Sequence, residues 1–159
     1  MDSLTLARIA HVFAVVVWIG GVCFVTTVLL PTARRAETPA DGMKMFQRIE
    51  RRFSMQARVM ILLAGLSGLY MLDRLDAWDR LSSATYWWMH AMIGVWVLFT
   101  VILFVVEPLV LDRWLAARAV VAPEATLRLL ERLHWVLLSL SIVTLLGAVA
   151  GAHGVLAFE

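Results

Sequence analysis

The amino-acid sequence predicts an all-α integral membrane protein, a four-helix up-down bundle. Hydrophobic residues make up 62% of its 159 residues and charged residues only 16%, which is more apolar surface than one soluble core of this size can bury. Four apolar runs approach the roughly 20 residues that a helix needs to cross a bilayer. We therefore predict a single transmembrane domain over residues 1–159, with spans at about 6–30, 53–73, 84–108 and 127–156.

The first span is expected to remain in the membrane, because Arg34 and Arg35 follow it as a stop-transfer pattern. It contains Cys23, the only cysteine, so the chain cannot form an intrachain disulfide. Beyond it, Pro39 and Asp41 predict a helix start. We expect this helix to lie at the cytoplasmic interface and to continue into the second span.

The third span follows three aromatic residues, beginning at Tyr86, that suit a membrane interface. Pro108 is expected to end or kink this span after Glu107. Pro123 and Glu124 fit the first turn of the fourth helix.

The basic residues predict the orientation of the spans. The first and third connections carry eleven of them: Arg34, Arg35, Lys44, Arg48, Arg51, Arg52, Arg58, Arg113, Arg118, Arg128 and Arg132. The opposite side has three, Arg8, Arg74 and Arg80. The positive-inside rule then places both termini on the periplasmic side of a bacterial inner membrane. The expected partners are the lipid bilayer and a second copy of the chain in a homo-oligomer. Nucleic-acid binding is not expected, because the sequence contains no motif that reads bases.

Three histidines are the candidate site. Counting residues from the outer boundary places His11, His90 and His153 at depths that agree within about 10 Å. Ionisable groups inside spans are costly and usually face an interior or a pathway. We predict that they hold a metal or haem iron, although each could instead hydrogen-bond to a neighbouring helix. His134 lies near the cytoplasmic end of the fourth span, where an interfacial role is expected.

The first and third helices are the diagonal pair of such a bundle, about 12 to 14 Å apart. This gap suits a porphyrin, so His11 and His90 are the preferred axial ligands of haem b. His153 could approach a propionate, ligate a second metal or replace one of the two. Trp18 would line the cofactor and Gly94 would leave room for it.

Two further features have alternative interpretations. Gly147 and Gly151 either make room for a porphyrin or simply let helices pack closely. Arg58 and Glu107, both near the inner face, could pair with each other or with lipid phosphate, and Glu107 could serve a proton path.

Parts of the chain resemble the copper-resistance protein D superfamily of four-helix membrane proteins. The resemblance rests on an H-x6-W-x-G-G pattern in the first span and on histidines and glycines of the last one. The residues concerned are His11, Trp18, Gly20, Gly21, His134, Gly147, Gly151 and His153. The resemblance implies copper handling or transport as the alternative function. In that case Met89 or Met92, which flank His90, would add a soft thioether ligand to the histidines.

The chain is also similar to the HemJ-type protoporphyrinogen oxidases, which bind haem b and place a histidine before a tryptophan in the first helix. Their third-helix motif is H-x-K, whereas this chain has His90, Ala91 and Met92 there. We therefore expect a haem b protein with a redox or electron-transfer role and an unidentified redox partner. Porphyrin oxidation is the less favoured alternative.

Overall fold

The fold is described from a computed structural model of the chain, which describes residues 2–154. Within these residues every regular element is helical. In chain order they are α1 (Ser3–Phe24), η1 (Val25–Leu29), α2 (Leu30–Arg34), α3 (Pro39–Arg74), η2 (Trp78–Ser82), η3 (Ala84–Tyr86), α4 (Trp87–Val101), η4 (Ile102–Leu111), α5 (Asp112–Val121) and α6 (Pro123–Ala152). The predicted all-α class is confirmed.

Four helical stretches of the described chain are long and apolar enough to cross a membrane. They are Ser3–Arg34, Pro39–Arg74, Ala84–Leu111 and Pro123–Ala152. Only 22–33% of their most apolar windows is buried inside the protein. Because so much exposed apolar surface is unfavourable in water, the chain is a multi-pass membrane protein with a four-helix bundle.

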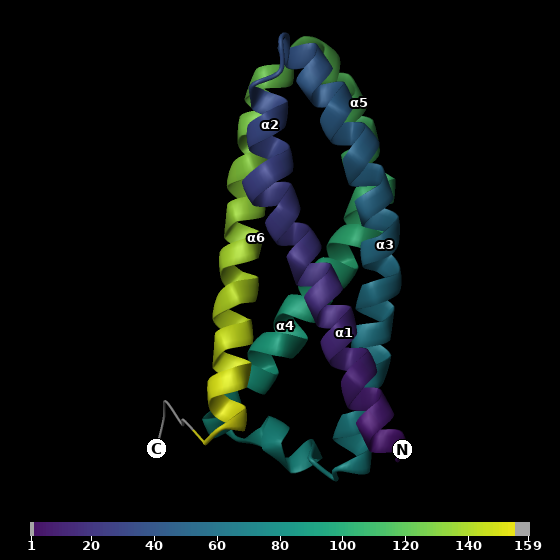
Figure 1. Cartoon of the computed structure of the whole chain (residues 1–159), viewed down its shortest axis with the longest axis vertical. Helices are drawn as coiled ribbons and strands as arrows, with labels where there is room; N and C mark the ends of the chain where they lie inside the picture. Colours follow the sequence, from purple (N-terminus) through teal and green to yellow (C-terminus); the bar gives the residue numbers. More distant parts are fainter. Residues whose placement is uncertain (1, 155–159) are drawn as a thin grey trace.

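Figure 1 shows the path of the chain. From the lower end of the view, α1 rises to α2, α3 returns, α4 and η4 rise again to α5, and α6 descends. The short helices η2 and η3 link α3 to α4 at the lower end. This end therefore gathers the start of α1, the start of α4 and the end of α6, the elements that carry the three candidate histidines.

Helix α3 extends well beyond a membrane span. Its 36 residues correspond to a length of about 54 Å, against a hydrocarbon thickness of about 30 Å. It begins at Pro39, and the hydroxyl oxygen of Thr38 accepts the N–H of Asp41 at 3.1 Å as an N-cap. The predicted start at Pro39 and the continuous helix into the second span are confirmed, as is the predicted start of α6 at Pro123.

Pro108 does not end the third long helix. The chain passes through it in the π-helical segment η4 and continues as α5 to Val121. Proline lacks an N–H and its ring clashes with the carbonyl four residues earlier, whereas a π-helix bonds to the carbonyl five residues earlier. The wider register lets the helix accommodate the proline.

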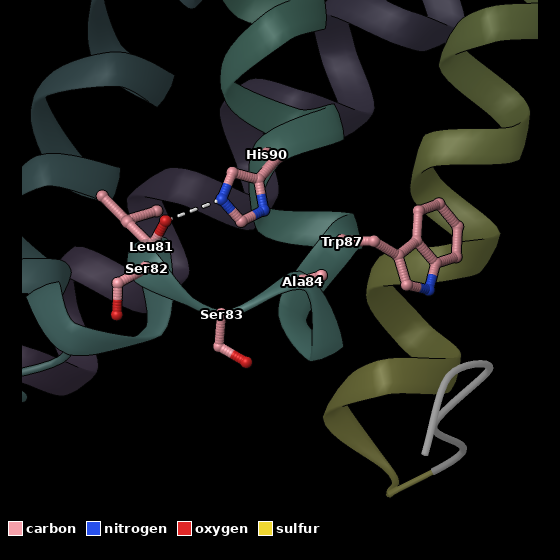
Figure 2. A pocket seen from close by; sticks show the side chains of 6 residues that line it. All are labelled: Leu81, Ser82, Ser83, Ala84, Trp87 and His90. Carbon is pink, nitrogen blue, oxygen red and sulfur yellow. Dashed lines mark hydrogen bonds between the residues drawn. The ribbon is translucent and has the colours of Figure 1, made fainter.

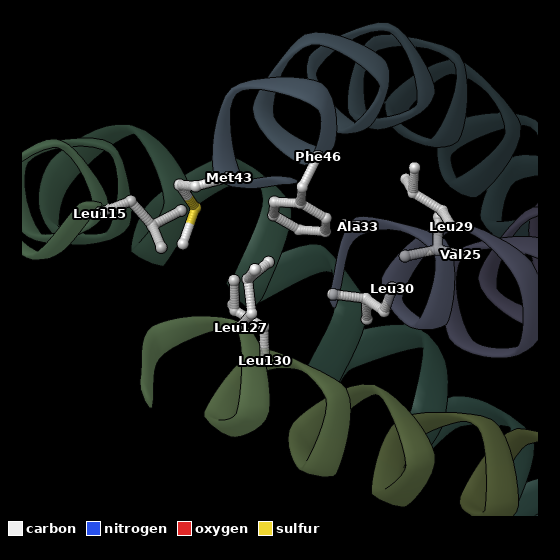
Figure 3. Close-up of a cluster of buried hydrophobic side chains, with 9 residues drawn as sticks. All are labelled: Val25, Leu29, Leu30, Ala33, Met43, Phe46, Leu115, Leu127 and Leu130. Carbon is white, nitrogen blue, oxygen red and sulfur yellow. The ribbon is translucent and has the colours of Figure 1, made fainter. Parts of the chain in front are cut away.

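Two apolar clusters fill the bundle. One, the inner cluster, lies among η1, α2, α3, α5 and α6 and contains Val25, Leu29, Leu30, Ala33, Met43, Phe46, Leu115, Leu127 and Leu130 (Figure 3). The other, the membrane cluster, contains Trp18, Val22, Ala57, Ile61, Val95, Phe99, Leu103 and Leu138. Phe53 packs against both.

Candidate functional site

His11 lies on the half-buried face of α1 and is held by α3. Its Nδ1 lies 2.9 Å from the carbonyl oxygen of Ala64 and 3.2 Å from Ser67 Oγ. The carbonyl can only accept, so Nδ1 carries the ring hydrogen in the neutral imidazole. The lone pair is then on Nε2, which is the arrangement found in most metal-binding histidines.

His90 lies at the start of α4, on an exposed face. Its Nε2 is 2.9 Å from the Leu81 carbonyl and its Nδ1 is 3.2 Å from the Tyr86 carbonyl. A neutral ring has one hydrogen, so it donates to one carbonyl at a time. Figure 2 shows the ring directed at Leu81, beside a hollow of about 510 Å³ that is also lined by Trp87 and residues 82–84.

The other two histidines make local hydrogen bonds within α6. His153, exposed at its end, approaches the carbonyl of Val149 at 2.8 Å through Nδ1. His134, at the opposite end, approaches the carbonyl of Leu130 at 2.9 Å in the same way. Its ring packs edge-on against Phe46, with 6.3 Å between centroids. His134 therefore lies toward the end of the bundle opposite His153.

The described residues do not gather the candidate ligands into one cluster. No group of three or more histidine, cysteine, aspartate or glutamate side chains in this part of the chain could hold a metal ion. The rings of His11, His90 and His153 instead hydrogen-bond to three different backbone segments. A haem needs only two of them.

Trp18 is buried at the centre of the bundle, 4% exposed. Its ring packs edge-on against Phe99, with centroids 4.9 Å apart, and so connects the diagonal helices α1 and α4. Its indole N–H has no hydrogen-bond acceptor among the described residues. A buried donor without an acceptor is unusual, so Trp18 is available to an acceptor that the chain itself does not supply.

The small residues expected to leave room differ in their surroundings. Gly94 is exposed, and a Cβ built on it would meet nothing within 4 Å. On α6, a Cβ at Gly147 would lie 2.3 Å from Trp87, and one at Gly151 would lie 2.3 Å from Trp88. Two indoles therefore cover these glycines, which supports the close-packing interpretation.

A family model described as "Domain of unknown function (DUF4149)" matches residues 13–119. The chain belongs to this family. No curated protein and no solved structure matches the chain. The DUF4149 match includes Trp18, His90 and Gly94, whereas His11 and His153 lie outside it.

The DUF4149 match also includes a second polar cluster, in the upper half of the bundle. Glu107, 7% exposed in η4, accepts a hydrogen bond from Ser54 Oγ at 2.6 Å and pairs with Nη2 of Arg58 at 3.1 Å. Of the alternatives considered for these two residues, the pairing of Arg58 with Glu107 is the one that the structure shows.

Sequence analysis missed two serines of these sites. Ser54 and Ser67 share one buried face of α3 with Ala57, Ile61 and Ala64. Their spacing of three and four residues is that of a helix face, and two hydroxyls on such a face are the signal that would have found them. Ser54 donates a hydrogen bond to Glu107, and Ser67 lies beside His11.

Proposed function

We propose that this chain is a haem b-binding redox protein of the bacterial inner membrane. His11 of α1 and His90 of α4 would hold the iron, in the outer half of the bundle. Two imidazole ligands saturate the iron and favour electron exchange over oxygen binding. A redox partner on the outer side or in the bilayer then donates or accepts the electron.

The observation that carries the proposal is the hydrogen bond from His11 Nδ1 to the carbonyl of Ala64, at 2.9 Å. It fixes the ring orientation and leaves Nε2 as the electron-pair donor. Such a ring inside a membrane helix is costly without a function. The acceptor-free N–H of Trp18, seven residues further along α1, supports a bound group in the same region.

To reach iron between α1 and α4, the ring of His90 would have to turn from the exposed face of α4 and leave the Leu81 carbonyl. In the present arrangement its Nε2 lies 2.9 Å from that carbonyl oxygen, to which an Nε2–H would donate. If the ring hydrogen moves to Nδ1, the Nδ1–H donates a hydrogen bond to the Tyr86 carbonyl 3.2 Å away. The lone pair of Nε2 is then free to bind iron. The indoles over Gly147 and Gly151 keep the porphyrin away from α6, so His153 is not assigned an axial position.

The orientation of the bundle is part of the proposal. The first and third connections lie at the upper end of Figure 1, and with their flanking helical turns they carry the eleven basic residues that favour the cytoplasm. Both termini then lie in the periplasm. Fusions to alkaline phosphatase, which is active only outside the cytoplasm, test this. A fusion after the last residue is expected to be active and a fusion in the connection at residues 35–38 inactive.

Absorption spectra of protein purified from haem-replete cells test the cofactor. The wild type is expected to show a Soret band, His11→Ala and His90→Ala to lose it, and His153→Ala to keep part of it. His134→Ala is the matched control, because His134 makes the same local hydrogen bond as His153 at the other end of α6. A wild type without a Soret band overturns the proposal.

Metal analysis of the same samples separates the alternatives. Iron and haem in equal amounts support the proposal. Copper without porphyrin, lost on Met92→Leu, would instead indicate copper handling of the copper-resistance protein D type. Turnover of protoporphyrinogen by the purified protein would indicate the porphyrin-oxidising activity.

A further inference from the structure

Three arginines of α3 lie exposed on one face of the helix, where its surface changes from charged to apolar. Arg48, Arg51 and Arg52 are all exposed. In the same stripe, one to two turns further along, Met55 is 64% exposed and Val59 is 57% exposed. The spacing of three, four and seven residues puts these five side chains on one face.

None of the ion pairs within 4 Å in the described part of the chain includes these three arginines. The ion pairs found there join Arg34 to Glu131, Lys44 to Asp41, Arg58 to Glu107 and Arg128 to Glu124. Like charges three and four residues apart on a helix repel each other. An anion from outside the chain would relieve this repulsion.

We propose that Arg48, Arg51 and Arg52 form a binding site for anionic phospholipid at the inner face of the membrane. Guanidinium groups bind phosphate through paired hydrogen bonds, and the exposed Met55 and Val59 next to them contact the acyl chains. A soluble phosphate would satisfy the arginines but leave the apolar half of the stripe uncovered. The combination therefore fits a lipid.

The same change from charge to apolar surface occurs on two other helices. On the stretch from η4 to α5, Leu109 and Val110 are 65% and 59% exposed, and Arg113 follows them. On α6, exposed Arg132 precedes Val136, which is 65% exposed. Each arginine marks the level at which its helix leaves the hydrocarbon. The α3 site therefore lies at the depth of the headgroups, with the inner cluster above it.

The test compares unfolding temperatures in vesicles of phosphatidylcholine alone and in vesicles that also contain phosphatidylglycerol. The wild type is expected to unfold at a higher temperature when phosphatidylglycerol is present. The variant Arg48→Gln/Arg51→Gln/Arg52→Gln is expected to lose most of this rise while unfolding normally in phosphatidylcholine. At about 1 kcal/mol for each arginine, its affinity for phosphatidylglycerol falls roughly 100-fold.

The matched control is Arg35→Gln/Arg118→Gln/Arg128→Gln, which removes the same charge from the same end of the bundle but from exposed positions outside α3. This control variant is expected to keep the rise in unfolding temperature that phosphatidylglycerol causes. The proposal is overturned if both variants lose it equally, because general charge would then explain the effect. It is also overturned if inorganic phosphate added to phosphatidylcholine vesicles reproduces the rise. Anionic lipid that co-purifies with the wild type but not with the α3 variant, counted by native mass spectrometry, supports the site independently.

Discussion

Arg58 donates its Nε–H to the main-chain carbonyl oxygen of Leu103 at 3.0 Å. In a π-helix that carbonyl would accept the N–H five residues later, but this position is Pro108, which has none. The arginine thus replaces the hydrogen bond that the proline removes. Because its Nη2 also pairs with Glu107, one side chain of α3 holds the proline-containing segment η4 in two places.

Removing this side chain is expected to destabilise the bundle. Arg58→Gln removes the donor to the Leu103 carbonyl and leaves the Glu107 carboxylate with Ser54 as a donor but without a cationic partner. We expect the free energy of unfolding to fall by about 2–3 kcal/mol. In the Pro108→Ala background the loss should be about 1 kcal/mol smaller, because an N–H is restored at position 108. Unfolding with sodium dodecyl sulfate in mixed micelles measures both. Strictly additive effects would show that Arg58 does not compensate for Pro108.

The contact between Gly147 of α6 and the Trp87 indole of α4 is expected to leave no room for a methyl group. Gly147→Ala places a Cβ 2.3 Å from the Trp87 ring, so the free energy of unfolding should fall by about 1–3 kcal/mol. Gly20→Ala is the control, since nothing lies within 4 Å of its Cβ. Here alanine should leave stability unchanged or raise it by up to about 1 kcal/mol. Similar losses at both positions would contradict the packing.

Asp76 ends α3 in a conformation that favours glycine. Its φ is 46°, and the N–H of Ala77 bonds to the carbonyl of Leu72 at 3.0 Å, as in a Schellman motif. Asp76→Gly is expected to raise the free energy of unfolding by about 0.5 kcal/mol. Asp73→Gly, the same change inside the helix, should lower it by about 1 kcal/mol. Unfolding in micelles distinguishes the two signs, and a loss at both positions would be inconsistent with this cap.

The cap at the start of α3 predicts a pH dependence. The Thr38 hydroxyl, and secondarily the charge of Lys44, hold the pKa of Asp41 below its usual value of 3.8. A lowered carboxyl pKa stabilises the fold above the unfolded value, and this stabilisation is lost as the pH falls through the folded value. Amide exchange in the first turn of α3, corrected for its intrinsic pH dependence, should therefore be constant near neutrality and accelerate below about pH 4.

Asp41→Asn tests the assignment of that effect. Asparagine keeps an oxygen for the Thr38 hydroxyl but does not titrate, so the acceleration at low pH should disappear. An unchanged pH profile would assign the effect to another carboxyl group.

The membrane class and the starts of α3 and α6 could be predicted because hydropathy and helix-start signals are read along the chain. The pairing of Arg58 with Glu107 was only one of the alternatives that the sequence left open. The direction in which the His90 side chain points could not be predicted. It faces the exposed side because Trp88 and Val95 of α4, 7% and 6% exposed, turn the other face inward. The two serines beside Glu107 and His11 were missed because a hydroxyl on a helix gives little signal in composition or charge.

The sequence by itself determined that the chain crosses the bilayer and where its long helices begin. These follow from the transfer of apolar groups into lipid and from the fixed rise of a helix. The tertiary structure alone decided that the Ala64 carbonyl orients the ring of His11 and that indoles of α4 pack over the glycines of α6. It alone also decided that Arg58 replaces the hydrogen bond lost at Pro108. The rotation of each helix about its axis is set by packing against its neighbours, which no single segment encodes.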